Sequence, residues 1–285
     1  MKNIYEETKF LMKKYNLTAN KKLGQNFLID DEAINKIVDS ANLTKEDLVM
    51  EIGPGLGTLT SMLLEKAGKV IAIELDDRMV KILQDRFLVY NNFELINEDV
   101  LKVNLPELIE ANKQFKSVKV VANLPYYITT PIIMKLLENR LNIESITIMI
   151  QKEVAERIVA TPGSKLSGAI TYSVHYYAEP EEVTIVPNTS FIPSPEVDSE
   201  VIKLVIRKEP PVELKDEKLF FNIIKASFMQ RRKTLANGLV NGGILQNKTE
   251  AVEVLKNIGL EENVRGEELS LEQFAKLSNE IYLRK

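Results

Sequence analysis

The stretch Val120-Val121-Ala122-Asn123-Leu124-Pro125-Tyr126-Tyr127 joins an apolar segment to a polar, aromatic turn. The β-branched residues from Val118 to Val121 predict a strand, which Asn-Leu-Pro ends. Residues 131–137 then predict a helix with Pro131 near its first turn. Open α/β sheets bind their ligands just past the carboxyl ends of strands. This turn is therefore a candidate site in an α/β fold.

The turn offers hydrogen-bond acceptors beside an aromatic ring. Asn123 contributes an amide, and the Leu124 and Pro125 carbonyls are expected to face no helical partner because proline ends the hydrogen-bond pattern. The ring of Tyr126 adds a flat surface beside these acceptors. Together they suit a planar group with N–H donors, such as a nucleobase amine. An ordinary Asx turn after a core strand explains the tetrapeptide equally well, so the rest of the chain must decide.

A glycine-rich turn follows the first clear strand, which is expected at residues 47–52. Gly53-Pro54-Gly55-Leu56-Gly57 leads from it into a helix that begins near Thr58. Bare amides and a helix N-terminus can approach a ligand closely at such a turn. A dinucleotide fingerprint, G-x-G-x-x-G, would need glycine at position 58. The spacing G-x-G-x-G, with Glu51 just before it, instead favours a ligand with a carboxylate and an amino group.

Polar residues end the three strands that follow the glycine turn. Glu74, Asp99 and Asn123 lie 17, 25 and 24 residues apart, counted from Gly57, which leaves room for one helix and one strand in each of the last two steps. An acid at Glu74 can accept both hydroxyls of a ribose, and Asp99 can accept from an adenine amine. A single acid at a strand end is more often a chance cap. Four such ends in register indicate one ligand site.

Two loops flank this pattern. Leu23-Gly24-Gln25-Asn26-Phe27-Leu28 precedes an amphipathic helix capped by Asp30 or Asp31 and could close over a ligand, although alone it is a weak signal. Residues 187–199 contain three prolines, which fix the shape of the loop and could hold Phe191 out from the sheet. A buried, structural role for Phe191 is equally compatible with the sequence.

The chain is expected to form two domains. The alternation of strands and helices predicts an α/β domain over residues 1–208, with a Rossmann-like sheet. The linker candidate is Glu209-Pro210-Pro211, and residues 209–285 predict a small all-helical domain. Its helices are expected at residues 217–229, 232–240, 248–258 and 270–283.

Composition narrows the possible chemistry. The chain has 285 residues, no cysteine and one histidine, which excludes disulfides, thiolate zinc sites and a histidine metal cluster. His175 lies in the aromatic run Tyr172–Tyr177, read as strand-like or as a buried helix, and is interpreted as structural. No apolar run approaches the ~20 residues of a membrane span, and the N-terminus is not a signal peptide. We therefore expect a soluble, cytoplasmic protein without a metal.

Charge is unevenly distributed along the chain. The net charge is −4, yet residues 1–28 hold six lysines, Lys21 and Lys22 among them, against two acids. Residues 203–238 hold nine Lys or Arg against four acids, and Arg231-Arg232-Lys233 is the densest group. Basic segments on an acidic body fit local contact with phosphates. Solvated helix faces explain each segment about equally well.

Taken together, these motifs resemble those of the ribosomal RNA adenine dimethyltransferases. The matching segments are Leu23–Leu28, Glu51–Gly57, Glu74–Asp76, Asp99, Asn123–Tyr126 and Phe191–Ser199, and they span most of residues 21–206. The Gly-Gln-Asn-Phe-Leu opening, the leucine in Asn-Leu-Pro-Tyr and the proline loop favour the small-subunit branch. A sister branch, which modifies large-subunit RNA, more often shows Ser-Gln-Asn-Phe and Asn-Ile-Pro-Tyr. A DNA adenine methylase usually has Pro-Pro-Tyr, and a catalytically idle assembly factor is a further alternative.

The resemblance implies a role for each matching position. S-adenosylmethionine would be the methyl donor, bordered by Asn26 and Leu28 and approached by Gly53 and Gly55. Glu74 would bind its ribose and Asp99 its adenine. Asn123 would lie between cofactor and target adenine, with Leu124, Pro125, Tyr126 and Phe191 completing the catalytic set. Tyr127 departs from the asparagine that many relatives carry, and its role stays open. The implied partner is small-subunit ribosomal RNA in an immature 30S particle, bound by a monomeric enzyme.

Overall fold

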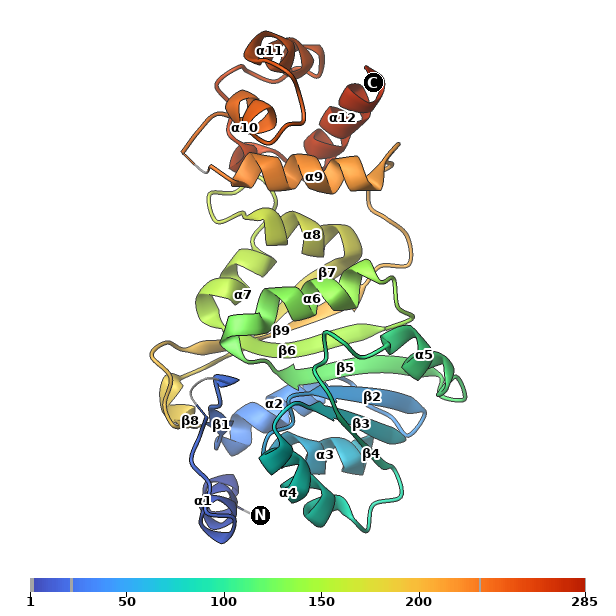
Figure 1. The fold of residues 1–285 in the computed structure, drawn as a ribbon, viewed down its shortest axis with the longest axis vertical. Helices are drawn as coiled ribbons and strands as arrows, with labels where there is room; N and C mark the ends of the chain where they lie inside the picture. The colour runs from blue at the N-terminus through green and yellow to red at the C-terminus, as the bar shows by residue number, and fades with distance from the viewer. Residues whose placement is uncertain (1–2, 21–22, 231, 285) are drawn as a thin grey trace. The chain divides into compact units, whose positions relative to one another are not determined.

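The structure is a computed structural model that describes residues 3–20, 23–230 and 232–284 (Figure 1). The chain divides into two compact units. The first contains the chain up to Ala155 together with Pro180–Ile206, and the second contains Glu156–Glu179 together with the chain from Arg207 onward. Each unit has its own hydrophobic core.

A seven-stranded sheet forms the centre of the first unit. Its strands are β2 (Asp47–Ile52), β3 (Lys69–Glu74), β4 (Phe93–Asn97), β5 (Ser117–Asn123), β6 (Ser145–Gln151), β7 (Ala178–Val186) and β9 (Ser199–Ile206). Their order is β4-β3-β2-β5-β6-β9-β7, in which β4 to β6 are parallel and β9 runs antiparallel to β6. The expected α/β class is confirmed, with an open, mostly parallel sheet.

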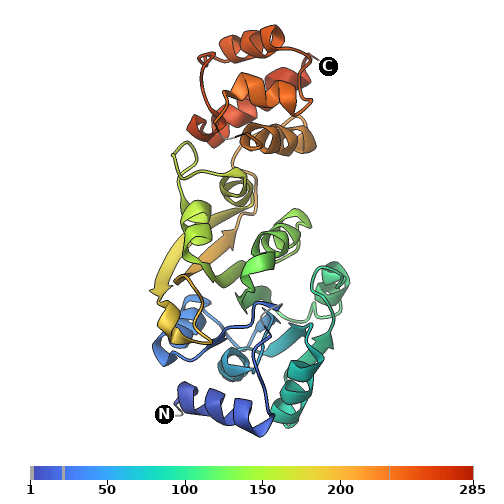
Figure 2. The same cartoon turned by 60° about the vertical axis from the view of Figure 1, so that its left-hand side comes forward.

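Helices connect the parallel strands and cover the sheet (Figures 1 and 2). The connecting helices are α3 (Thr58–Lys66), α4 (Asp77–Phe87), α5 (Leu105–Glu110) and α6 (Thr129–Glu138), whereas α1 (Ile4–Lys14) and α2 (Asp31–Ser40) precede β2. Right-handed crossovers place α3 and α4 on one face and α5 and α6 on the other, because the strand order reverses between β2 and β5. Such a reversal opens a crevice at the carboxyl ends of the strands, and this is where a ligand is expected.

A short strand pair fixes the proline-rich loop. In the two-stranded sheet of β1 (Phe27–Leu28) and β8 (Phe191–Ile192), Leu28 pairs with Phe191. Phe191 is only 3 % exposed and packs in the hydrophobic core with Phe27 and Leu28. Of the two interpretations of Phe191, the structure supports the buried one and not a ring held out from the sheet, because pairing with β1 turns the ring into the core.

The second unit is helical. It contains the end of α7 (Lys152–Val159), α8 (Ala169–Tyr177), α9 (Glu217–Phe228), α10 (Leu235–Asn241), α11 (Lys248–Asn257) and α12 (Leu271–Tyr282). The sequence assigned residues 156–179 to the first domain, whereas the structure groups them with the C-terminal helices. Tyr172 explains the difference: its ring lies 4.8 Å from that of Phe274, and its hydroxyl donates to the Leu269 carbonyl at 2.7 Å. The run that contains His175 is thus a buried helix and not a strand.

Among the residues that the structure describes, no helix is long and apolar enough to cross a membrane. The same residues contain no group of three or more His, Asp or Glu side chains placed to hold a metal ion.

Candidate active site

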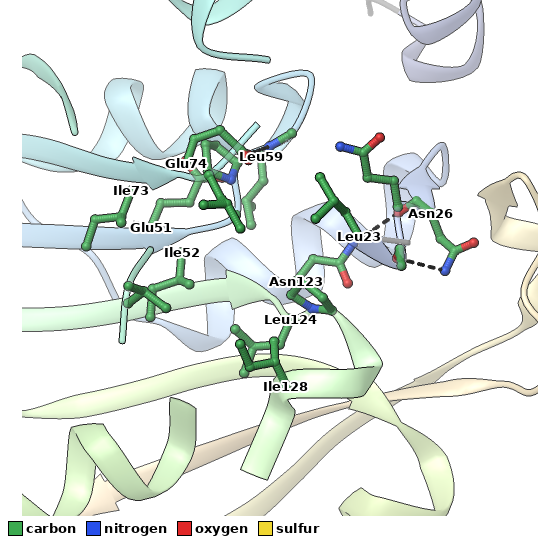
Figure 3. A pocket seen from close by; sticks show the side chains of 18 of the residues that line it. Leu23, Asn26, Glu51, Ile52, Leu59, Ile73, Glu74, Asn123, Leu124 and Ile128 are labelled. Atoms are coloured by element: carbon green, nitrogen blue, oxygen red, sulfur yellow. Dashed lines mark hydrogen bonds between the residues drawn. The ribbon is translucent and has the colours of Figure 1, made fainter. Parts of the chain in front are cut away.

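A pocket lies at the carboxyl ends of β2, β3 and β5 (Figure 3). The space within it, including space open to solvent, amounts to about 1170 Å³. Ten of the eleven predicted site residues line it: Asn26, Leu28, Gly53, Gly55, Glu74, Asp99, Asn123, Leu124, Pro125 and Tyr126. Phe191, the eleventh, does not.

The glycine turn forms the floor of the pocket. Gly53 and Gly55 have φ angles of +66° and +57°, which lie in the left-handed region that other residues rarely adopt. The Gly53 N–H donates to the Ile73 carbonyl at 3.0 Å, which fixes the turn to the neighbouring strand. An added Cβ at Gly55 would lie 3.5 Å from the Phe27 ring. The turn therefore keeps its backbone bare toward the pocket.

Glu74 is held rigidly at the end of β3. Its Oε2 accepts the Gly55 N–H at 3.1 Å, and its Oε1 accepts the Asp76 N–H at 2.8 Å. Burial and the nearby charge of Asp76 raise the pKa of Glu74, although the two backbone N–H groups oppose the shift. Each oxygen retains a lone pair, so both can accept hydroxyls from a ligand without rearrangement.

Glu51, the last residue but one of β2, is the most unusual group in the pocket wall. It is 1 % exposed, and its Oε2 has no hydrogen-bond partner among the described residues. Burial, together with the negative charge of Glu74, raises the pKa of Glu51 to about 8. A buried carboxyl without a partner costs free energy unless a ligand supplies one. Glu51 therefore indicates a ligand that brings a positive or N–H-bearing group.

Asp99 lies in a turn two residues beyond β4, and not at the strand end as the sequence indicated. Its Oδ1 accepts the Leu101 N–H at 2.9 Å, which forms a tight local turn. Lys135 of α6 holds this turn from the other side, because its Nζ donates to the Leu101 and Val103 carbonyls at 2.7 and 2.8 Å. Asp99 thus lines the pocket from a braced loop.

Asn123 is the last residue of β5, and in the view of Figure 3 it lies between the two glutamates and Asn26. Its Nδ2 donates to the Asn26 carbonyl at 3.5 Å, a long hydrogen bond that still orients the amide. With the nitrogen directed to Asn26, the amide oxygen is left as an acceptor for a donor in the pocket. Asn26 in turn donates from its own amide to the Gly24 carbonyl at 3.3 Å.

The Leu124 and Pro125 carbonyls differ in their hydrogen bonding. The expectation that both lack a partner is therefore wrong for one of them. The Pro125 carbonyl accepts the Ile128 N–H at 3.2 Å and the Thr129 hydroxyl at 3.1 Å, because a short 3₁₀ turn (Tyr126–Ile128) leads into α6. No hydrogen bond from a described residue reaches the Leu124 carbonyl, whereas its N–H is bound to the Met149 carbonyl at 3.1 Å. Leu124 therefore supplies the second free acceptor of the turn.

The two tyrosines of the turn have different environments. Tyr126 is partly buried, and its hydroxyl lies 2.6 Å from the Ser199 hydroxyl. Tyr127 is 57 % exposed, and its ring passes beside Gly24. Both line the pocket. Tyr126 is held in place, whereas Tyr127 stands at the pocket mouth.

The N-terminal segment contributes more of the wall than the sequence indicated. Residues 23–28 all line the pocket. Gln25 anchors them, since its Nε2 donates to Asp76 Oδ2 at 2.8 Å. The apolar residues Ile52, Leu75 and Val100 were also missed, although each is adjacent in sequence to a predicted strand-end residue. Only their position beside a strand end could have predicted these three residues, because apolar residues at strand ends are usually part of the core.

Comparison with known proteins gives a consistent result. The family model described as ribosomal RNA adenine dimethylase matches residues 16–282. "Ribosomal RNA small subunit methyltransferase A" of Lachnoclostridium phytofermentans is 49 % identical over 278 residues, 97 % of this chain and 96 % of the relative. The protein of that name from Clostridium botulinum strain Kyoto is 51 % identical over 275 residues, 96 % of this chain and 98 % of the relative.

Among solved structures, a dimethyladenosine transferase from Plasmodium falciparum superposes with a TM-score of 0.74 at 30 % identity, covering 88 % of this chain and 95 % of the other. The 23S rRNA methyltransferase ErmE superposes with a TM-score of 0.69 at 26 % identity, covering 90 % and 100 %.

Proposed function

The chain belongs to the ribosomal RNA adenine dimethylase family, and we propose that it transfers methyl groups from S-adenosylmethionine to adenine N6 amines of small-subunit (16S) ribosomal RNA. The observation that carries the proposal is one pocket with two kinds of wall. Glu51, Glu74 and Asp99 offer carboxylates on the side of β2 to β4, and the Asn123–Tyr126 turn offers neutral acceptors and a ring at the end of β5.

The carboxylate wall fits the methyl donor. Glu74 is placed for ribose hydroxyls and Asp99 for the adenine amine. The glycine turn leaves room for the methionine end, whose ammonium would give the unpartnered Glu51 Oε2 a partner. When bound, S-adenosylmethionine supplies a methyl group activated by a sulfonium. Asn26 and Leu28 border the same space.

The neutral wall fits the target amine. An adenine amine is a poor nucleophile because its lone pair is delocalised into the ring. The Asn123 amide oxygen and the Leu124 carbonyl would accept its two N–H groups and favour a pyramidal nitrogen with an available lone pair. No strong base is required, because the methylated nitrogen loses its proton readily. Catalysis is then mainly positioning and electrostatic stabilisation.

The target adenine must leave its helix to reach this turn. Stacking on Tyr126 would hold such a base, as aromatic rings do for unstacked RNA bases. Phe191 is buried and takes no part in this arrangement. The proposal therefore assigns stacking to Tyr126, with Asn123 and Leu124 reading the amine.

An acidic protein needs local basic surface to hold RNA. Lys225 of α9 and the following Arg232 and Lys233 are exposed on the second unit, and we propose that they contact phosphates of the small-subunit particle. Arg231, Lys21 and Lys22 lie outside the described residues. We further propose that the enzyme acts in the cytoplasm, as its composition indicates, and as a monomer, as the resemblance implies.

The experiment that tests the function is methyl transfer from labelled donor to purified, undermethylated small subunits, large subunits and free RNA, with the product nucleosides identified. Dimethyladenosine formed only in small subunits is expected. Label in large subunits would favour the large-subunit type of enzyme. Binding of particle and donor without methyl transfer would favour an assembly factor.

Single-turnover rates then test the site. Asn123→Ala should lower the rate far more than particle affinity, because one acceptor acts within a large interface. Tyr126→Ala should lower the rate through loss of stacking worth about 1–3 kcal/mol. Rates near wild type for both variants would mean that the reaction occurs elsewhere.

A further inference from the structure

The proline-rich loop ends in a residue whose role the proposed function leaves open. Phe191, at its start, is buried in the core and lies outside the pocket lining. Ser199, at its end, is fully buried, and its hydroxyl oxygen lies 2.6 Å from that of Tyr126. This is a short O–H···O hydrogen bond between two segments that are 73 residues apart in sequence.

The Ser199 hydroxyl is held by a rigid frame. Ser199 is the first residue of β9 and pairs with Gln151 at the end of β6. The preceding residue, Asp198, is fixed twice: its carbonyl accepts the Lys152 N–H at 3.0 Å, and its carboxylate accepts the Asn188 N–H at 2.9 Å. The loop therefore delivers this hydroxyl to a defined point at the carboxyl edge of the sheet.

Tyr126 is consequently fixed at both ends of its side chain. Its backbone begins the 3₁₀ turn after β5, and its phenol oxygen is bound to Ser199 across the end of β6. Burial raises the pKa of Tyr126, so the phenol keeps its proton near neutral pH and the hydrogen bond persists. A ring with only its Cα fixed can adopt several χ1 rotamers, whereas a hydrogen bond at the phenol oxygen holds the ring axis in one direction.

We propose that Ser199 is a positioning residue for methyl transfer: its hydroxyl holds in one direction the Tyr126 ring on which the target adenine stacks. The inference rests on the proposed function and deepens it. Catalysis by positioning depends on small displacements, since moving a base away from the methyl donor lowers the rate without removing a contact. Ser199 acts on the base only through Tyr126 and does not touch it.

A double-mutant cycle tests this inference. Ser199→Ala, Tyr126→Phe and the double variant are compared by single-turnover methyl transfer to small subunits at saturating donor and particle. Each single variant removes the same hydrogen bond, so each should lower the rate roughly three- to tenfold, the range that one such bond corresponds to. The double variant should be no slower than the slower single variant, because the second change removes nothing further.

Controls separate positioning from folding. Ser194→Ala makes the same change in the same loop, where the hydroxyl donates to the Asn188 carbonyl at 2.8 Å away from the pocket, and it should leave the rate unchanged. Donor affinity, measured by calorimetry, should be equal in all variants. Non-additivity that appears in the free energy of unfolding but not in the rate would mean that the bond is only structural, and would overturn the inference.

Two other results would also overturn the inference. One is additive losses of rate in the double variant, and the other is a normal rate for Ser199→Ala when Tyr126→Phe is slow. If the wild-type enzyme methylates small subunits and the rate losses of the two single variants are additive, this inference alone is overturned. A wild-type enzyme that methylates no small subunits overturns the proposed function and this inference with it.

Discussion

The two ends of strand β2 carry carboxylates in opposite situations. Asp47 begins the strand and Glu51 lies next to its last residue; both side chains are buried. The pKa of Asp47 is lowered and that of Glu51 is raised to about 8. The two groups share the strand and expose little surface, but Glu51 is the more deeply desolvated, and the two edges of the sheet supply different partners.

Asp47 has partners on both oxygens. Its Oδ1 accepts the Ser117 hydroxyl at 2.7 Å, and its Oδ2 accepts the Thr44 N–H at 2.6 Å and Lys119 Nζ at 3.1 Å. Burial alone would raise its pKa, but these hydrogen bonds and the lysine charge outweigh it. The amino edge of the sheet thus buries a compensated ion pair.

Glu51 lacks such compensation, since the Thr60 hydroxyl and, to a smaller extent, Arg86 lower its pKa but do not offset burial. A sequence selected only for stability would not keep an unpartnered carboxyl at this position. The comparison indicates that charges at the amino edge serve the fold, whereas the carboxyl edge holds a protonated carboxyl that a cationic ligand can ionise.

The largest effect is expected at the compensated edge. Lys119→Met should destabilise the protein by about 3–5 kcal/mol, because it leaves Asp47 buried without its cation. Donor affinity should be unchanged in the folded variant. Denaturant unfolding and calorimetry measure the two quantities, and Lys116→Met is the control, since Lys116 pairs with Glu46 at 3.0 Å in an exposed position and should matter little. Equal stability of the two variants would contradict the contrast between the edges.

The uncompensated edge should respond to pH. Because the folded pKa of Glu51 is raised to about 8 from 4.5, the folded state retains a proton that the unfolded state loses between these values. The contribution of Glu51 to stability therefore falls as pH rises from 4.5 to 8, by about 3 kcal/mol at pH 7. Glu51→Gln should remove this fall and make the variant more stable than wild type above pH 7, as urea unfolding at several pH values would show. Parallel profiles for the two proteins would contradict it.

The same residue should release a proton when the donor binds. A positive ammonium beside Glu51 favours its ionised form, so binding at pH 7 should expel close to one proton. Calorimetry in buffers of different ionisation enthalpy measures this number, which should vanish in Glu51→Gln together with part of the affinity. An equal release in both proteins would place the ammonium elsewhere.

The next effect concerns the carboxylates with local hydrogen bonds. Glu74→Ala and Asp99→Ala should each weaken donor binding by about 1.5–3 kcal/mol, or roughly ten- to hundredfold, since each loses a charge-assisted hydrogen bond to the ligand. The fold should persist, because neither residue carries the core. Titration calorimetry checks the affinities, with Glu65→Ala, an exposed carboxylate on α3, as the control. If donor affinity were unchanged in both folded variants, Glu74 and Asp99 would not be donor-binding residues.

The sequence predicts those site residues that directly follow a strand recognisable from its own apolar run. Apolar runs locate β2, β3 and β5, and the polar residues that follow them meet because parallel strands end at one edge. Asp99 shows the limit of this logic: the strand ends at Asn97, and the loop beyond it is braced by Lys135 from a helix that the local pattern does not connect to it.

Long-range pairing was not predictable from the sequence. Phe191 is buried because its strand pairs with Phe27–Leu28, over 160 residues earlier, and nothing near Phe191 encodes that partner. Residues 156–179 join the C-terminal helices through Tyr172, whose ring partner Phe274 lies about 100 residues later in the chain. The capture of the Pro125 carbonyl by Thr129 depends on a 3₁₀ turn that the proline signal does not specify.

The smallest effect is expected at exposed charges of the second unit. Replacing Arg232 and Lys233 by Gln should weaken binding to the small-subunit particle roughly three- to tenfold near 0.1 M salt and flatten the salt dependence by one to two in slope, because each phosphate contact releases about one counterion. Donor affinity should not change, since phosphate contacts position the protein and carry no chemistry. Particle affinity measured across a salt series gives both the loss of affinity and the change in slope. Lys248→Gln with Lys256→Gln, exposed on α11, removes the same charge elsewhere and should shift the series less. If the two double variants give superimposable lines, the effect is net charge alone and the pair beyond α9 does not dock the RNA.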